Sequence, residues 1–85
     1  MITLKNNSMI ATHKIEDITF DQNSIHLQID GKSLNIALDK ISLKLKSAND
    51  LQRKFFKISP SGYGIHWPLI DEDLSVDALL KIVGQ

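Results

Sequence analysis

The fold is decided by residues 25–36, which read Ile25-His26-Leu27-Gln28-Ile29-Asp30-Gly31-Lys32-Ser33-Leu34-Asn35-Ile36. Apolar and polar residues alternate on both sides of Asp30-Gly31, which is the period of a β-strand with one buried face. An Asp-Gly pair between two such runs favours a type I′ turn, because both of its central residues have positive φ. The stretch therefore predicts a β-hairpin in which Leu27 lies opposite Leu34.

The alternation continues toward the N-terminus and predicts a second hairpin. A turn at Gln22-Asn23 would set Phe20 opposite Ile25. It would also set Ile18 opposite Leu27, so that the apolar residues of both hairpins lie on one face. We therefore expect a three-strand antiparallel meander with one buried face.

A short helix is expected after the meander, at residues 48–54. Ser47 would be its N-cap, and Asp50 would lie near the positive end of the helix dipole. Residues 39–46 fit a strand and a helix equally well. In this prediction the helix shows its basic side chains, including Arg53, to solvent.

The C-terminal part is expected to hold one more hairpin and one more helix. Strands are predicted at 55–58 and 65–67, and Pro68 would end the second because proline cannot donate to a ladder. Ser75 would cap a helix at 76–83, whose apolar stripe covers the open face of the sheet. The predicted fold class is α+β: a small antiparallel sheet, made of the meander plus a C-terminal hairpin, with one short middle helix and one short C-terminal helix.

Length and composition limit the classes of protein. The chain has 85 residues and no cysteine, which suits one small domain and excludes disulfides and Cys-based zinc sites. Its formal net charge is zero, so there is no global attraction to nucleic acid or membrane. No apolar run approaches the roughly 20 residues that span a bilayer, and the N-terminus does not read as a secretory signal. We expect a cytoplasmic protein with no cofactor and no membrane association, divided into an N-terminal arm (1–14) and a single α+β domain (15–85).

Basic residues gather between positions 40 and 57, where Asp50 is the one acidic residue. The candidate basic face consists of Lys44, Lys46, Arg53 and Lys54. Such a stretch is most typical of a solvated helix with its flanks, and a docking face for nucleic acid or an acidic partner is the alternative. The residues leave both readings open.

The segment 62–80 carries the densest chemistry. Its candidate interaction residues are Tyr63, His66, Trp67, Asp71, Glu72 and Asp73. His66 with the nearby carboxylates could hold a metal, or it could bond across a strand while the acidic run precedes a helix N-terminus. Trp67 could be an interface residue or a core residue with its N–H bonded to a carbonyl. No serine stands in a nucleophile motif, so we expect no catalytic residues and no enzymatic activity.

The same segment resembles a known family. Gly62-Tyr63-Gly64-Ile65-His66-Trp67-Pro68, then Asp71-Glu72-Asp73-Leu74-Ser75, then Leu79-Leu80, is similar to the bacterial domain of unknown function 2442. The resemblance covers about residues 15–82 and is most specific in 62–80. It implies a small α+β domain without established catalytic residues, often encoded beside a second small protein in gene pairs like those of toxin–antitoxin systems.

These observations give one leading hypothesis and two alternatives. The leading one is a non-catalytic protein-interaction module, the antitoxin-like component of a two-gene system, whose partner is the product of an adjacent gene. The alternatives are a small nucleic-acid-binding regulator that uses residues 40–57, and a metal-binding or hydrolytic protein that uses His66 with Asp71 and Asp73. A small sheet with an open edge also favours a homodimer.

Overall fold

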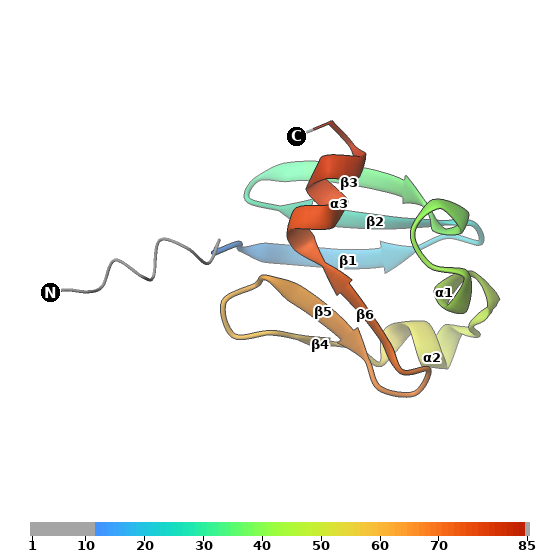
Figure 1. Cartoon of the computed structure of the whole chain (residues 1–85). Helices are drawn as coiled ribbons and strands as arrows, with labels where there is room; N and C mark the ends of the chain where they lie inside the picture. The colour runs from blue at the N-terminus through green and yellow to red at the C-terminus, as the bar shows by residue number, and fades with distance from the viewer. Residues whose placement is uncertain (1–11, 85) are drawn as a thin grey trace, which may run out of the picture.

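The computed structural model describes residues 12–84, which form two three-stranded antiparallel sheets and four short helical elements (Figure 1). Sheet A contains β1 (Ile15–Phe20), β2 (Ser24–Ile29) and β3 (Lys32–Ala37). Sheet B contains β4 (Lys57–Ile58), β5 (Gly64–Trp67) and β6 (Glu72–Ser75). The helices are the 3-10 turn η2 (Leu38–Lys40) and the α-helices α1 (Leu43–Ser47), α2 (Asp50–Lys54) and α3 (Val76–Ile82). The α+β class predicted from the sequence is confirmed.

Sheet A is the predicted meander in the predicted register. Leu27 pairs with Leu34 across one hairpin and with Ile18 across the other. Asp30 and Gly31 have φ of 53° and 80°, as a type I′ turn requires. The apolar residues of β2 are buried on one face, so the alternation in the sequence sets which side of the sheet faces the core.

The middle of the chain differs from the prediction of one helix capped by Ser47. There are two helices, α1 and α2, because Ala48 between them is extended. Ser42 caps α1 by accepting from the N–H of Leu45, and Ser47 is the last residue of that helix. Asn49 caps α2 in a capping box, in which Gln52 returns the bond to the N–H of Asn49. Each helix is preceded by a residue type that favours the N-cap, Ser42 for α1 and Asn49 for α2, whereas the prediction chose Ser47.

Arg53 is buried rather than exposed, with 7% of its surface accessible. Its guanidinium donates to backbone carbonyls at the end of α1 and in the β1–β2 turn: those of Leu45, Lys46, Asp21 and Gln22. It also lies 5.3 Å from the centre of the Phe20 ring. The prediction that Arg53 belongs to a solvent-facing basic surface is therefore wrong, because these carbonyls occupy its donors.

Sheet B has one strand more than the predicted hairpin. β4 pairs with β5 as expected, although it is limited to Lys57–Ile58, and β5 ends at Trp67 immediately before Pro68. The acidic run was predicted as a helix entry, but residues 72–75 form β6, which pairs with β5 along its whole length. Pairing with β5 outweighs the low strand propensity of acidic residues.

The core joins both sheets and α3. Trp67 is fully buried, and its ring packs against Phe20 of sheet A and against Phe56. Its indole N–H donates to the carbonyl of Arg53 at 3.0 Å, as predicted for a core tryptophan. Ser75 caps α3, which crosses in front of sheet A and adds Val76 and Leu79 to the same core (Figure 1). No helix among residues 12–84 is long and apolar enough to cross a membrane.

The last two residues of the predicted arm contact the domain. The N–H of His13 donates to the carbonyl of Ser61, and Lys14 exchanges two hydrogen bonds with Asp30. The last residues of the predicted arm (1–14) are therefore bonded into the domain, because Ser61 and Asp30 hold them. Residues 1–11 lie outside the described residues.

Candidate functional site

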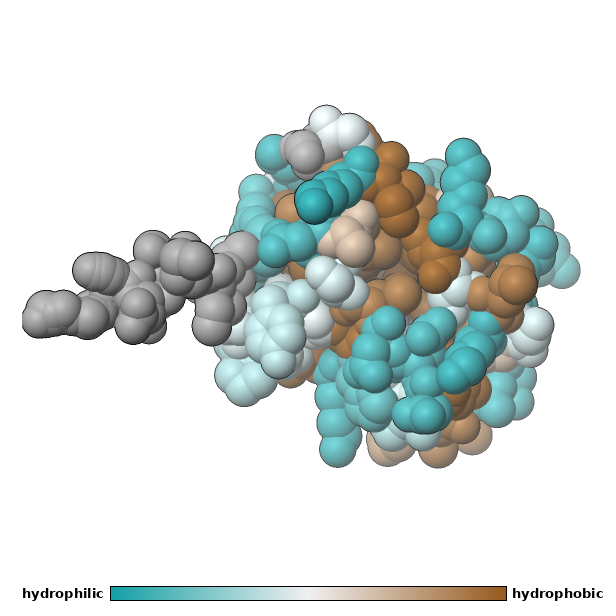
Figure 2. All heavy atoms as spheres, in the orientation of Figure 1, coloured by the Kyte–Doolittle hydropathy of each residue, from teal (hydrophilic) through white to brown (hydrophobic). Residues whose placement is uncertain are grey.

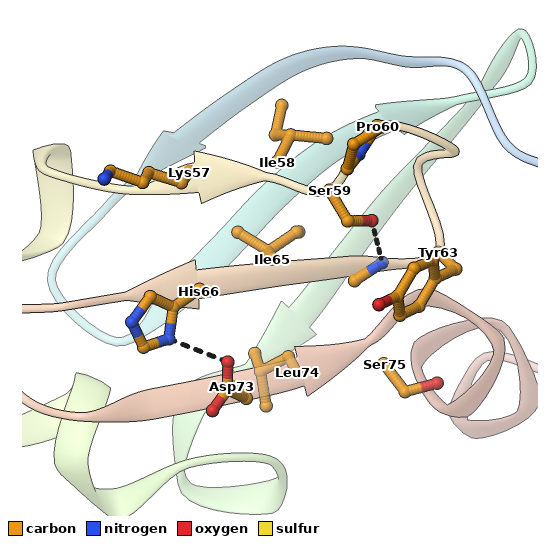
Figure 3. Close-up of a pocket in the computed structure, with 11 residues that line it drawn as sticks. Lys57, Ile58, Ser59, Pro60, Tyr63, Ile65, His66, Asp73, Leu74 and Ser75 are labelled. Atoms are coloured by element: carbon orange, nitrogen blue, oxygen red, sulfur yellow. Dashed lines mark hydrogen bonds and ion pairs between the residues drawn. The ribbon is translucent and has the colours of Figure 1, made fainter.

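Sheet B carries an open hollow of about 560 Å³. Its lining consists of residues 57–60, 63–66 and 73–75, and we call it the sheet-B hollow. Figure 3 shows these residues coming from all three strands. Ile58 is 41% exposed, whereas Ile65 on the central strand is buried and belongs to the core. The lining is mostly apolar, and the volume is in the range of about 300–1,000 Å³ found for binding sites.

One end of the sheet-B hollow is a polar row across the three strands. Lys57 pairs with His66, and His66 pairs with Asp73 (Figure 3). The Nδ1 of His66 donates to the Asp73 carboxylate at 2.7 Å, with 40% of the His66 side chain exposed. An exposed pair of this kind contributes at most about 1 kcal/mol to stability, so it serves to orient the imidazole more than to hold the sheet.

The other end is the β4–β5 turn, which presents Tyr63. The turn closes by a bond from the N–H of Gly62 to the carbonyl of Ser59, and the Ser59 hydroxyl accepts from the N–H of Gly64. Tyr63 stands between the two glycines with 55% of its surface exposed, next to Pro60 at the hollow. Figure 2 shows this tip in pale colours, which mark residues of intermediate hydropathy. The tip therefore offers an uncharged aromatic contact at the rim of the hollow.

The segment that builds this site also identifies the family. Residues 15–84 match the family described as Protein of unknown function (DUF2442). The chain belongs to this family. The match covers nearly the same residues as the resemblance drawn from the signature in 62–80, and that resemblance is confirmed. No curated protein and no solved structure matches the chain.

The DUF2442 fold brings together some of the candidate interaction residues. Tyr63, His66 and Asp73 all line the sheet-B hollow. Trp67 belongs to the same strand as His66, but it points into the core and has no exposed surface. A partner cannot contact the Trp67 side chain on this surface, so its place among the interaction residues is wrong.

The other two acidic candidates serve the structure elsewhere. A carboxylate oxygen of Glu72 accepts from the hydroxyl of Ser42, which links β6 to the start of α1. Asp71 has a φ of 52° in the turn before β6, and its carbonyl accepts from the Lys44 ammonium at 2.9 Å. Neither residue lines the sheet-B hollow.

The arrangement around His66 does not favour the metal alternative. His66 bonds across the strand to Asp73, which is the second reading that the sequence allowed. Asp71 stands beyond that strand in the turn. Within residues 12–84 no group of three or more His, Asp or Glu side chains is placed to hold a metal ion.

The candidate basic face is also divided. Arg53 is buried, Lys44 bonds to a backbone carbonyl, and Lys46 pairs with Asp39 at 3.6 Å. Lys54 ends α2 and is exposed. Because Arg53 faces the core, the four residues do not form the continuous basic stripe that a nucleic-acid surface uses.

Sequence reasoning missed Lys57, Ile58 and Leu74, which line the sheet-B hollow. For Ile58 a signal existed: the predicted pairing of 55–58 with 65–67 already placed it beside Ile65. Leu74 had no such signal, because its position depends on β6, which was not predicted.

A cluster around His13 was missed as well. Its Nδ1 and Nε2 donate to Asp30 at 2.8 Å and to Asp77 at 2.9 Å, with 10% of the side chain exposed. The bond to Asp30, followed by the bond to Asp77, raises the pKa of His13 above its usual 6.5, against the lowering effect of burial. The bond from His13 in turn lowers the pKa of the Asp30 carboxyl. Because the partners are 17 and 64 residues away, nothing local in the sequence indicated this cluster.

Proposed function

We propose that this DUF2442 protein is a non-catalytic protein-interaction module, the antitoxin-like member of a two-gene pair, which acts in the bacterial cytoplasm. Its partner is the product of the adjacent gene, and the contact surface is the sheet-B hollow. The observation that carries the proposal is the mostly apolar, open surface next to a half-exposed tyrosine. Exposed apolar surface of this kind, with a polar rim, marks interaction sites.

The chemistry of the hollow favours binding over catalysis. The Ser59 hydroxyl accepts from the N–H of Gly64, and the Ser75 hydroxyl accepts from the N–H of Ala78. Both hydroxyls therefore stabilise the backbone, one in a turn and the other at a helix start. The Nδ1 of His66 is held by Asp73, so both serine hydroxyls and the histidine of the hollow are engaged in structural hydrogen bonds.

The free energy of binding would come from the apolar part of the hollow. Covering apolar surface contributes about 25 cal/mol per Å², so burying an aromatic side chain such as Tyr63 outweighs a rim ion pair of at most about 1 kcal/mol. Tyrosine also loses little conformational entropy on binding and donates from its hydroxyl. Lys57, His66 and Asp73 would set the orientation of the partner at the polar end.

Co-purification with the product of the adjacent gene tests the proposal. The wild-type chain is expected to carry that protein through affinity purification and size exclusion. Tyr63→Ala should weaken the complex at least about 10-fold, as expected for a hot-spot aromatic. Leu51→Ala is the matched control, because Leu51 is 70% exposed on α2 outside the sheet-B hollow. The proposal fails if the two proteins do not associate, or if both variants behave alike.

A further inference from the structure

The edges of the two sheets differ in how well they are protected against strand pairing. β1 carries a bulge between Ile15 and Asp17, β4 is two residues long, and β6 carries Glu72 and Asp73. Bulges, shortness and charge are the usual means by which proteins prevent edge-to-edge association. Three of the four edge strands in residues 12–84, β1, β4 and β6, are therefore protected against pairing with another strand.

β3 lacks these features. It runs straight for six residues, and its single charged residue, Lys32, stands at its first position. Within the described residues it has one hydrogen-bonded neighbour, β2. Figure 1 shows α3 crossing the face of sheet A rather than running alongside β3. Ser33 and Asn35 are exposed on the polar face of sheet A.

The hydrogen-bonding pattern shows which backbone groups this edge offers. The type I′ turn makes Ile29 and Lys32 a hydrogen-bonded pair, and such pairs alternate along an antiparallel ladder. At the far end the N–H of Leu38 donates to the carbonyl of Asn23, so the even-numbered residues of this strand are the ones that bond to β2. The residues of β3 whose N–H and C=O groups point away from β2 are therefore Ser33, Asn35 and Ala37.

We infer that β3 is a self-association edge, which pairs antiparallel with β3 of a second copy and joins the two sheets A into one six-stranded sheet. The register that uses every outward-pointing group sets Asn35 opposite Asn35 of the second copy. Leu34 then lies opposite Ile36, so the buried faces of the two sheets become continuous.

Charge complementarity supports a second copy as the occupant. In this register Lys32 at the start of one β3 lies beside the end of the other β3, where η2 carries the exposed Asp39, whose carboxylate also pairs with Lys46 of its own chain. The two-fold symmetry repeats this contact at the other end of the pair. β3 and β4 lie on opposite sides of the molecule in Figure 1, so pairing through β3 leaves the sheet-B hollow open.

The mass of the full chain in solution is the first test. Sedimentation equilibrium is expected to give twice the 9.6 kDa chain mass at high concentration, with dissociation on dilution. A single-chain mass at every concentration up to about 1 mM, the weak end of specific association, would overturn the inference.

A matched pair of variants locates the interface. Asn35→Lys places like charges directly opposite each other at the two-fold axis and should raise the dimer dissociation constant about 5-fold. Thr19→Lys adds the same charge to the same polar face, but on β1, and should leave the constant within about 2-fold. Equal effects of the two variants would place the interface elsewhere.

Amide exchange of the wild-type chain gives a readout that needs no variant. The N–H groups of Ser33, Asn35 and Ala37 are expected to exchange more slowly as the concentration rises, because they bond only in the dimer. Exchange at these amides that does not depend on concentration would contradict β3 pairing even if the chain dimerises.

Discussion

At Gly62 the backbone has a φ of 72°, and an added Cβ would lie 1.9 Å from the carbonyl oxygen of His13. Gly62→Ala must therefore accept a left-handed backbone conformation and also push away the segment that holds His13. We expect a loss of about 3 kcal/mol or more in the free energy of unfolding, measured by urea titration.

Gly31 is the matched control for this effect. It has a similar φ of 80°, but an added Cβ would meet nothing within 4 Å. Gly31→Ala is expected to cost only the backbone term, about 1–2 kcal/mol. Equal losses in the two variants would show that the close packing of His13 against Gly62 is absent in solution.

The His13 cluster predicts a pH dependence of stability with a defined sign. Both ring nitrogens can donate to carboxylates only when the imidazole is protonated, and its pKa is raised in the folded state. The stabilisation is therefore complete below the unfolded value of about 6.5 and is lost as the pH rises through the folded pKa. Asp30, whose pKa is lowered, stays ionised throughout this range.

Unfolding of wild type and His13→Gln at pH values from about 5.5 to about 9 measures this contribution. The difference in unfolding free energy is expected to be largest at the acidic end and to shrink as the pH rises. An NMR titration should give a His13 pKa above 6.5 in the folded chain. A difference that grows with pH, or a pKa at or below 6.5, would contradict the geometry of the cluster.

Individual residues show where sequence reasoning at this scale succeeds. The core position of Trp67 was one of the two readings that the sequence allowed, and it follows from the large apolar ring of tryptophan, whose N–H finds a partner when buried. The burial of Arg53 could not be predicted in the same way. It depends on carbonyls in the β1–β2 turn, about 31 residues away, that become available only once that turn has folded.

At the scale of the elements, the start of α1 gives a direct test of the corrected helix boundaries. Ser42 accepts from the N–H of Leu45 and donates to Glu72, whereas Ser47 makes no cap. Ser42→Ala is expected to cost about 1–2 kcal/mol in unfolding free energy, and Ser47→Ala less than about 0.5. A larger loss of unfolding free energy for Ser47→Ala than for Ser42→Ala would instead support a single helix capped by Ser47.

Arg53 joins α1, α2 and the β1–β2 turn into one unit. Arg53→Lys keeps the charge but loses the planar fork that reaches several carbonyls, so we expect a loss of about 2–4 kcal/mol in unfolding free energy. Lys54→Ala, at the exposed neighbouring position, should change it by less than about 0.5 kcal/mol. A comparably small effect of Arg53→Lys would mean that its carbonyl contacts contribute little.

The elements differ in how far the sequence could predict them. The meander could be predicted with its register because Asp30-Gly31 and the apolar alternation are local and agree with each other. β6 could not, since its acidic residues 72 and 73 have low strand propensity and become a strand through pairing with β5. Eight of the eleven residues that line the candidate site belong to the predicted hairpin of β4 and β5, and the other three, at 73–75, depended on β6.

At the scale of the whole molecule, the two sheets share a core and divide the surface. Trp67 of sheet B packs on Phe20 of sheet A, so the sheets form one packed unit. β3 lies on one side of that unit and the sheet-B hollow on the other (Figure 1). The two proposed contact surfaces, one for a second copy and one for a different protein, are therefore separate on the molecule.

The most direct measurement is an NMR titration of the labelled chain with the product of the adjacent gene. The account predicts that amide shift changes gather at residues 57–66 and 73–75, which hold the lining of the sheet-B hollow, and that Tyr63→Ala removes them. Shift changes that gather instead on the basic stretch 40–54, or no shift changes at all, would contradict it.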